Sequence, residues 1–283
     1  MEHSTLMRAF RQVDNYFVNL PGLKGFFEAT GYPLLATNWP TILFWTLFFH
    51  FVSNSSLILL AIIKRQKIEK IDKKLQMSWR SHVTSQVHAL VAVAFSLTAL
   101  YQNNLADDRV HGFDKLILSA TNFSLGYFLW DLHLCIIDFS GQGPQFLAHA
   151  VLGALNLVPP YVPNVMYYVP VFLFFEASTI FLNMVWFCDK VGLSGSTFQL
   201  VNGVLLAIVF FFVRLVFGTL KMIQFYKDVA IDAENVGIML YILAHLSITV
   251  FWSLNVFWFY KIVQSIIKKC KASVATKDDL KKE

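Results

Sequence analysis

Charged residues are scarce in this chain, and their scarcity excludes an ordinary soluble domain. Only 14% of the 283 residues are Asp, Glu, Lys or Arg, whereas 56% are hydrophobic and 28 are Phe. A soluble domain has roughly 25% charged residues. The sequence therefore predicts an integral membrane protein. Its formal net charge of +5 is modest and lies in basic loops and a basic tail, so a nucleic-acid-binding surface is not expected.

Several other features are missing, and each absence excludes a class. Three cysteines, Cys135, Cys188 and Cys270, are too few for a disulfide framework. The first 40 residues lack the compact apolar core of a signal peptide. There is no Gly-rich phosphate loop, no nucleophile elbow and no pair of histidines at helical metal-site spacing. We therefore expect no metal and no bound cofactor. The chain also lacks the alternation of a membrane barrel, so its membrane spans should be helices.

Long apolar runs dominate what is present. About seven of them approach the roughly 20 residues that cross a bilayer, which predicts an all-α, polytopic bundle around a cavity with a polar end. The predicted spans cover Thr41–Ile63, His82–Tyr101, Leu116–Ile137, Phe146–Val158, Val165–Phe187, Phe198–Met222 and Val236–Ile267. We expect residues 1–40 to form a lumenal or interfacial segment, 41–267 the membrane domain and 268–283 a basic cytosolic tail.

Basic residues set the expected orientation. The segment Lys64–Arg80 carries seven Lys or Arg against Glu69 and Asp72, so it should lie in the cytosol and the N-terminus in the lumen. Seven crossings then place the basic tail in the cytosol as well. The short span Phe146–Val158 could instead re-enter on the same side.

Polar side chains inside the apolar runs mark the candidate site. A carboxylate near the middle of a bilayer is costly unless it is neutral, paired or facing a cavity. We therefore expect Asp131 and Glu176 to face a pocket or to form an ion pair with Arg214. The polar end of a lipid pocket is predicted to comprise His88, Tyr127, Asp131, His149, Glu176, Asn183 and Arg214. Hydroxyls and single histidines on these spans could equally serve as bonds between helices.

An ordered set of motifs resembles the TLC domain. These are Trp79-Arg80-Ser81 with Ser85 and His88-Ala89-Leu90-Val91, Gly126-Tyr127 with Asp131-Leu132, Glu176-Ala177-Ser178 with Phe181, Asn183 and Trp186-Phe187, and Asn202-Gly203 followed by the phenylalanine-rich run to Arg214. The resemblance covers about residues 40 to 265. It is nearer to the small TLC domain-containing proteins of the TLCD-four type than to the ceramide synthases.

This resemblance implies a bundle of six or seven helices around a membrane-embedded cavity, in the endoplasmic reticulum or alternatively the Golgi. The resemblance also implies that the ceramide synthases are relatives. These enzymes use two adjacent histidines to transfer an acyl chain from acyl-CoA to a sphingoid base. Here the matching segment reads Phe146-Leu147-Ala148-His149-Ala150, so one histidine of that pair is alanine. If the chain is an enzyme, His149 would be the catalytic base and Asp131 its orienting carboxylate, with acyl-CoA as substrate.

Three functions stay open at this point. The first is a protein with little or no catalysis that binds or senses a lipid and contributes to membrane lipid homeostasis, sphingolipids included. The second is an acyl-CoA-dependent lipid acyltransferase of the ceramide synthase type. The third and weakest is a lipid transporter or cargo receptor, since no inverted repeat is visible. The expected partner is a membrane lipid, and the sequence does not settle whether the protein forms a homodimer.

Overall fold

The computed structural model describes residues 23–29, 31–162 and 164–280, and throughout these residues the regular structure is helical. The predicted all-α fold is confirmed. The main helices are α2 (Leu23–Ala29), α3 (Pro33–Lys64), α4 (Lys73–Gln102), α5 (Lys115–Ile137), α6 (Phe139–Gln142), α7 (Pro144–Asn156), α8 (Tyr168–Leu173), α9 (Glu176–Lys190), α10 (Thr197–Phe210), α11 (Gly218–Ile231) and α12 (Ala233–Leu280). Residues 1–22 of the predicted lumenal or interfacial segment 1–40 lie outside the described residues.

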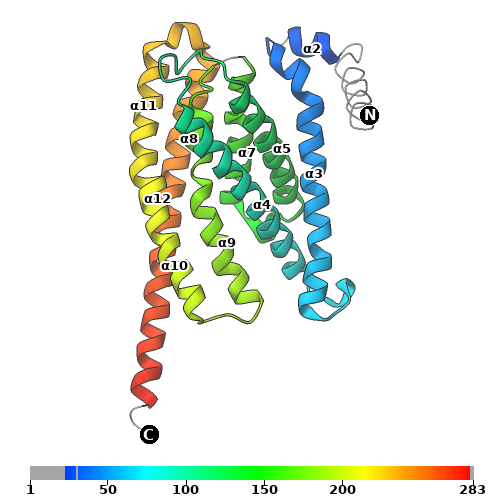
Figure 1. Ribbon diagram of the computed structural model, residues 1–283, viewed down its shortest axis with the longest axis vertical. Helices are drawn as coiled ribbons and strands as arrows, with labels where there is room; N and C mark the ends of the chain where they lie inside the picture. The colour runs from blue at the N-terminus through cyan, green and yellow to red at the C-terminus, as the bar shows by residue number, and fades with distance from the viewer. Residues whose placement is uncertain (1–22, 30, 163, 281–283) are drawn as a thin grey trace.

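The helices run up and down in one elongated bundle (Figure 1). The long helix α3 forms one side and packs against α4 and α5, and α11 and α12 pack together on the other side. The shorter helices α5, α7, α8 and α9 lie between these two sides. The turn between α3 and α4 and the C-terminal end of α12 lie at the same end of the bundle. The predicted cytosolic placement of both basic segments requires this arrangement.

Local sequence explains where several helices begin. Asp72 precedes α4, and its carboxylate accepts a hydrogen bond from the amide of Leu75 at 2.9 Å. Asp114 caps α5 in the same way by accepting from the amides of Leu116 and Ile117. Burial works to raise the pKa of Asp114, but hydrogen bonds from Asn104 and these amides outweigh it and lower that pKa. A carboxylate at each N-cap satisfies amides that the helix itself leaves unpaired.

Among the described residues, five helical segments are long and apolar enough to cross a membrane, which supports an integral, multi-pass protein. They are Pro33–Lys64, Lys73–Gln102, Tyr168–Lys190, Thr197–Ile231 and Leu240–Lys268. The helix α5 has the length of a span, but its composition is too polar to be counted with these five. The helix α7 has 13 residues, about 20 Å at 1.5 Å per residue, against a hydrocarbon core of about 30 Å. Seven crossings therefore stay a prediction.

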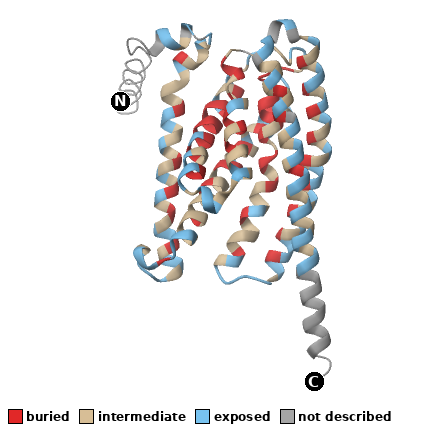
Figure 2. Cartoon of the chain, turned by 180° about the vertical axis from the view of Figure 1, so that it is seen from behind, coloured by how far each residue is buried: buried red, intermediate tan, exposed pale blue. Residues whose placement is uncertain are grey.

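Two irregular segments create the setting of the site. Between α8 and α9 the chain breaks at Phe174 and Phe175, and α9 restarts with Glu176 as its first residue. Between α10 and α11 the segment η3 (Phe211–Phe217) is a π-helix. Segments of π-helix are rare and are frequent at functional sites. Buried residues gather in the half of the bundle away from the α3–α4 turn (Figure 2), and both irregular segments contribute to it.

Candidate lipid-binding site

A cavity lies between α7, α8, α9, η3, α11 and α12, with a volume of about 100 Å³. A single buried water needs roughly 10–15 Å³ of such space, so a far larger ligand fits. Most of its wall is apolar. The apolar lining residues are Phe128, Leu157, Pro159, Val165, Val169, Phe172, Leu173, Phe175, Met222, Phe225, Leu240 and Phe251.

Three of the predicted site residues line this cavity: His149 from α7, Glu176 from α9 and Arg214 from η3. Asn156 and Ser247 line it too, and the Asn156 amide donates to the Ser247 hydroxyl at 2.7 Å. An apolar cavity with a few convergent polar groups is the usual form of a small-molecule site. The cavity thus combines a hydrocarbon-compatible wall with a charged region.

Arg214 is held by neutral oxygen atoms. Its Nε donates to the Ser178 hydroxyl at 2.8 Å, its Nη2 to the Thr179 hydroxyl at 3.2 Å and its Nη1 to the Asn255 side-chain oxygen at 3.3 Å. Its guanidinium also lies 5.1 Å from the ring centre of Phe210. Within the described ranges, Arg214 forms no direct ion pair. The expected ion pair with Glu176 or Asp131 is therefore not seen. Instead, both charged residues line one cavity.

Glu176 is buried, with 8% of its surface exposed. It lies in the first turn of α9, where the helix dipole favours a negative charge. The Thr179 hydroxyl that accepts from Arg214 is also the hydrogen-bonding neighbour of the Glu176 carboxylate. Carboxylate and guanidinium are thus connected through one hydroxyl, and both remain available on the cavity wall.

His149 lies among aromatic rings on the cavity wall. The ring centres of Phe128, Phe251 and Trp258 are 5.7, 5.8 and 5.6 Å from its own. Its Nδ1 is buried and has no hydrogen-bond partner among the described residues. A buried polar atom without a partner is uncommon, because it costs free energy to bury one. A ligand in the cavity could supply the missing partner.

The other predicted site residues lie elsewhere. His88 is completely buried and stacks on Tyr127 with ring centres 3.9 Å apart, and its Nε2 lies 3.2 Å from the Ser124 hydroxyl. This stack belongs to the core between α3, α4 and α5. The Phe128 ring lies between it and the cavity, since that ring contacts both His88 and His149.

Asp131 is half-buried on α5 and does not line the cavity. No hydrogen bond joins it to His149 in the described part of the chain, although it is close enough to Glu176 to interact electrostatically. Asn183 belongs to a third cluster, where its side-chain oxygen lies 2.8 Å from Nδ1 of His82 and its amide donates to Ser85. The predicted set is therefore divided between the cavity, the His88 stack and the Asn183 cluster, and Asp131 belongs to none of the three.

The family follows from comparison with known proteins. The family model of the TLC domain matches residues 78–264, which is more than half of the chain. This chain belongs to the TLC-domain family. The cavity, Glu176, Arg214 and His149 all fall inside the matched TLC domain.

The relatives of this TLC-domain protein point to one type within the family. It is 30% identical to TLC domain-containing protein 4-B of Danio rerio, over 67% of this chain and 74% of that protein. Identity is also 30% to TLC domain-containing protein 4 of Xenopus tropicalis, over 70% and 78%. An uncharacterized TLC domain-containing protein of Schizosaccharomyces pombe is 29% identical over 87% and 85%. The chain is thus of the TLC domain-containing protein 4 type. No solved structure matches it.

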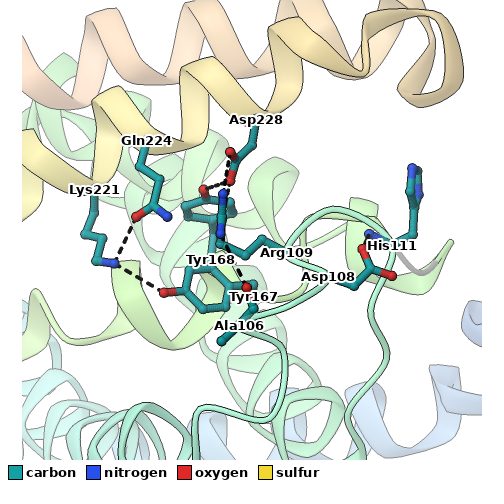
Figure 3. A network of polar contacts seen from close by, with 9 residues as sticks. All are labelled: Ala106, Asp108, Arg109, His111, Tyr167, Tyr168, Lys221, Gln224 and Asp228. Atoms are coloured by element: carbon teal, nitrogen blue, oxygen red, sulfur yellow. Dashed lines mark hydrogen bonds and ion pairs between the residues drawn. The ribbon is translucent and has the colours of Figure 1, made fainter.

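The structure adds a polar network to this TLC domain that the sequence did not reveal (Figure 3). Arg109, from the loop between α4 and α5, donates from Nε and Nη2 to both carboxylate oxygens of Asp228 on α11, at 2.6 and 2.9 Å. The Tyr168 hydroxyl donates to the same carboxylate. The hydrogen bond with Asp228 raises the pKa of Arg109 further above its usual range, against the opposing effect of burial.

This network borders the cavity, because Tyr168 also lines it. Next to it, Lys221 donates to the Tyr167 hydroxyl at 3.2 Å and to the side-chain oxygen of Gln224 at 2.9 Å (Figure 3). The sequence carried one signal for these contacts, since a charged residue near the end of an apolar run needs a partner. It did not show that the partner lies 119 residues away.

Proposed function

We propose that this TLC-domain protein binds a membrane lipid in the cavity between α7, α8, α9, α11 and α12 and contributes to membrane lipid homeostasis in the endoplasmic reticulum. The observation that carries the proposal is the composition of the cavity wall. Apolar side chains form most of it, and Glu176, Arg214 and His149 provide charge and hydrogen bonding in one region. A lipid has the matching composition: hydrocarbon chains and one polar head.

The polar residues favour a head group that both donates and accepts hydrogen bonds. Arg214 can face an acceptor, whereas Glu176 and the unpartnered Nδ1 of His149 can face a donor. An amine or alcohol next to an amide or ester oxygen would satisfy both. Sphingoid bases, ceramides and related lipids carry such groups.

Mass spectrometry of copurifying lipids tests this function. The protein is purified in mild detergent as wild type, Glu176→Gln and Glu69→Gln. The control Glu69→Gln makes the same substitution at an exposed loop position. We expect one lipid class enriched over the bulk extract in wild type and control, and depleted by about tenfold in Glu176→Gln, since a hydrogen bond to a charged group contributes about 1.5–3 kcal/mol. Equal lipid profiles in all three folded proteins would refute the proposal.

A second function has one specific observation in its favour. The buried Nδ1 of His149 has no partner among the described residues, and it lies on the wall of a cavity that also holds a carboxylate. A histidine so placed could take a proton from an amine or alcohol in an acyl transfer from acyl-CoA. Incubation with acyl-CoA and a sphingoid base tests this. Product formed equally by wild type and His149→Ala would exclude His149 from that role.

A further inference from the structure

Arg80 lies near the start of the candidate membrane span Lys73–Gln102, just before the predicted span His82–Tyr101, and its partners among the described residues are all neutral. It is half-buried, and its Nε and Nη2 donate to Ser53 at 3.1 Å and to Asn54 at 2.7 Å on α3. Its Nη1 contacts the Met77 sulfur at 3.7 Å. In the described part of the chain it forms no ion pair. Charged side chains inside membrane spans are usually paired with an opposite charge, so the structure raises the question of what neutralises Arg80.

The guanidinium also has donors to spare. It carries five N–H groups, and three are used in the contacts with Ser53, Asn54 and Met77. The remaining two, on Nη1 and Nη2, have no acceptor among the described residues. Asn54 is itself fixed, because its amide donates to the backbone oxygen of His50 at 2.9 Å. Arg80 is therefore held in position by neutral groups while part of its hydrogen-bonding capacity stays open.

Two histidines lie beside this guanidinium. The rings of His50 on α3 and His133 on α5 have centres 5.0 Å apart, and Arg80 is close enough to His50 to interact electrostatically. Neither imidazole forms a hydrogen bond with any residue that the structure describes. An imidazole offers at least one N–H donor in each of its protonation states. The three side chains thus form a cluster of donors that has no ion pair with an acidic residue in the described part of the chain.

The cluster opens onto the face of the bundle that should contact lipid. His133 and Asn54 are exposed, yet their neighbours on the same helix faces are large, exposed and apolar. These neighbours are Leu47, Phe51 and Ile58 on α3 and Leu129 and Ile136 on α5.

The depth of Arg80 fits a head group. It lies seven residues after Lys73, the first residue of α4, and thus about 10 Å along the helix from the end with the basic Lys64–Lys74 segment. Clusters of Lys and Arg next to a span attract anionic lipids.

We propose that the cluster of Arg80, His50, His133 and Asn54, on α3, α4 and α5, binds the phosphate of an anionic phospholipid entering from the lipid-facing side. The two open N–H groups of Arg80 donate to phosphate oxygens, and the imidazoles add further donors. Arginine suits phosphate through its planar, paired donors. This site is separate from the cavity, because none of its four residues lines that cavity.

Native mass spectrometry of the full chain in non-ionic detergent tests the site. The delipidated protein is titrated with phosphatidylserine, with phosphatidylcholine and with inorganic phosphate. We expect one saturable phosphatidylserine per chain, weaker binding of phosphatidylcholine and no competition by millimolar inorganic phosphate. Arg80→Gln should weaken phosphatidylserine binding about 10- to 100-fold, the equivalent of one hydrogen bond to a charged group.

Matched variants decide between this site and simpler explanations. Lys74→Gln removes one positive charge from the same end of α4 at an exposed position, and it should leave phosphatidylserine binding unchanged. His133→Leu replaces an exposed side chain on an apolar face, so it should fold normally and still weaken binding. Glu176→Gln, in the cavity, should also leave this binding intact.

Three results would overturn the proposal. Unchanged binding by both Arg80→Gln and His133→Leu would exclude the Arg80 cluster as the site. Equal losses in Lys74→Gln and Arg80→Gln would mean diffuse charge attraction. Displacement of the lipid by inorganic phosphate would mean a site for the free ion.

Discussion

At the scale of single residues, Arg214 is both a buried charge, which costs free energy, and a polar group on the cavity wall. Its guanidinium is buried, with 7% of the residue exposed, and burying a charge is costly unless other groups replace water. Ser178, Thr179 and Asn255 supply three oxygens, and the rings of Phe175 and Phe210 lie at 5.7 and 5.1 Å. The same guanidinium faces the cavity. Stability and the proposed lipid binding therefore depend on one side chain.

Replacing Arg214 should separate these roles. Arg214→Ala leaves the buried Glu176 carboxylate without a nearby positive charge, and we expect a loss of roughly 3–5 kcal/mol in the free energy of unfolding. The double variant Arg214→Met with Glu176→Gln removes both charges and should recover much of that loss. Denaturation in mixed detergent micelles measures both. A double variant no more stable than Arg214→Ala would show that the two charges are not coupled.

At the scale of helices, one close approach fixes the position of α5 against α3. Gly126 faces the backbone of α3, where a Cβ would lie 2.5 Å from the Trp45 Cβ and 2.9 Å from the Thr46 amide nitrogen. Backbone atoms cannot move aside as a flexible side chain can. Small residues at helix contacts in membranes allow this kind of packing. The aromatic core around His88 depends on it, because Phe123 and Tyr127 belong to the same helix.

Gly126→Ala should therefore separate α3 from α5 and reduce stability by about 1–3 kcal/mol, the usual cost of overpacking. Gly203→Ala on α10 is the matched control, because its Cβ would meet nothing within 4 Å. There alanine should be neutral or slightly stabilising. Thermal unfolding followed by circular dichroism compares the two. Similar midpoints for both variants would contradict the close contact.

The order of the helices along the chain could be predicted from the sequence. The set of residues at the site could be predicted only in part. Apolar run lengths indicate spans because a bilayer imposes a fixed thickness. Helical spacing also shows which residues share a face: Ser124 and Tyr127 do lie together near His88. Spacing cannot show how each helix is rotated against its neighbours. For that reason His88, Asp131 and Asn183 were grouped with His149 and Glu176, whereas the structure places them in other clusters.

At the scale of the whole molecule, the Arg109–Asp228 pair connects the two sides of the bundle. Arg109 belongs to the loop after α4, and Asp228 lies near the end of α11. Tyr168 joins them at the end of the cavity. Leu105 and Val110 of the loop between α4 and α5 pack against the apolar core, and the Arg109–Asp228 pair should restrain the loop further. Local stability of this kind is measured by hydrogen exchange.

Arg109→Gln should therefore speed hydrogen exchange in residues 103–114 and in the last turns of α11, with little change in the global unfolding midpoint. The reason is that partly exposed ion pairs contribute only about 0–1 kcal/mol. Asp107→Asn, at an exposed position of the same loop, serves as the control. Exchange rates that match between Arg109→Gln and wild type would mean that other contacts restrain the loop.

The π-helix Phe211–Phe217 has a consequence for how α11 is oriented about its own axis. An α-helix turns about 100° per residue, whereas a π-helix turns less per residue because its hydrogen bonds reach one residue further. Every side chain after η3 is therefore rotated from where an unbroken α-helix would direct it. That rotation brings Met222 and Phe225 to the cavity wall and Asp228 to Arg109. The seven residues of η3 thus set the rotation of α11 about its axis and determine which of its faces lines the cavity.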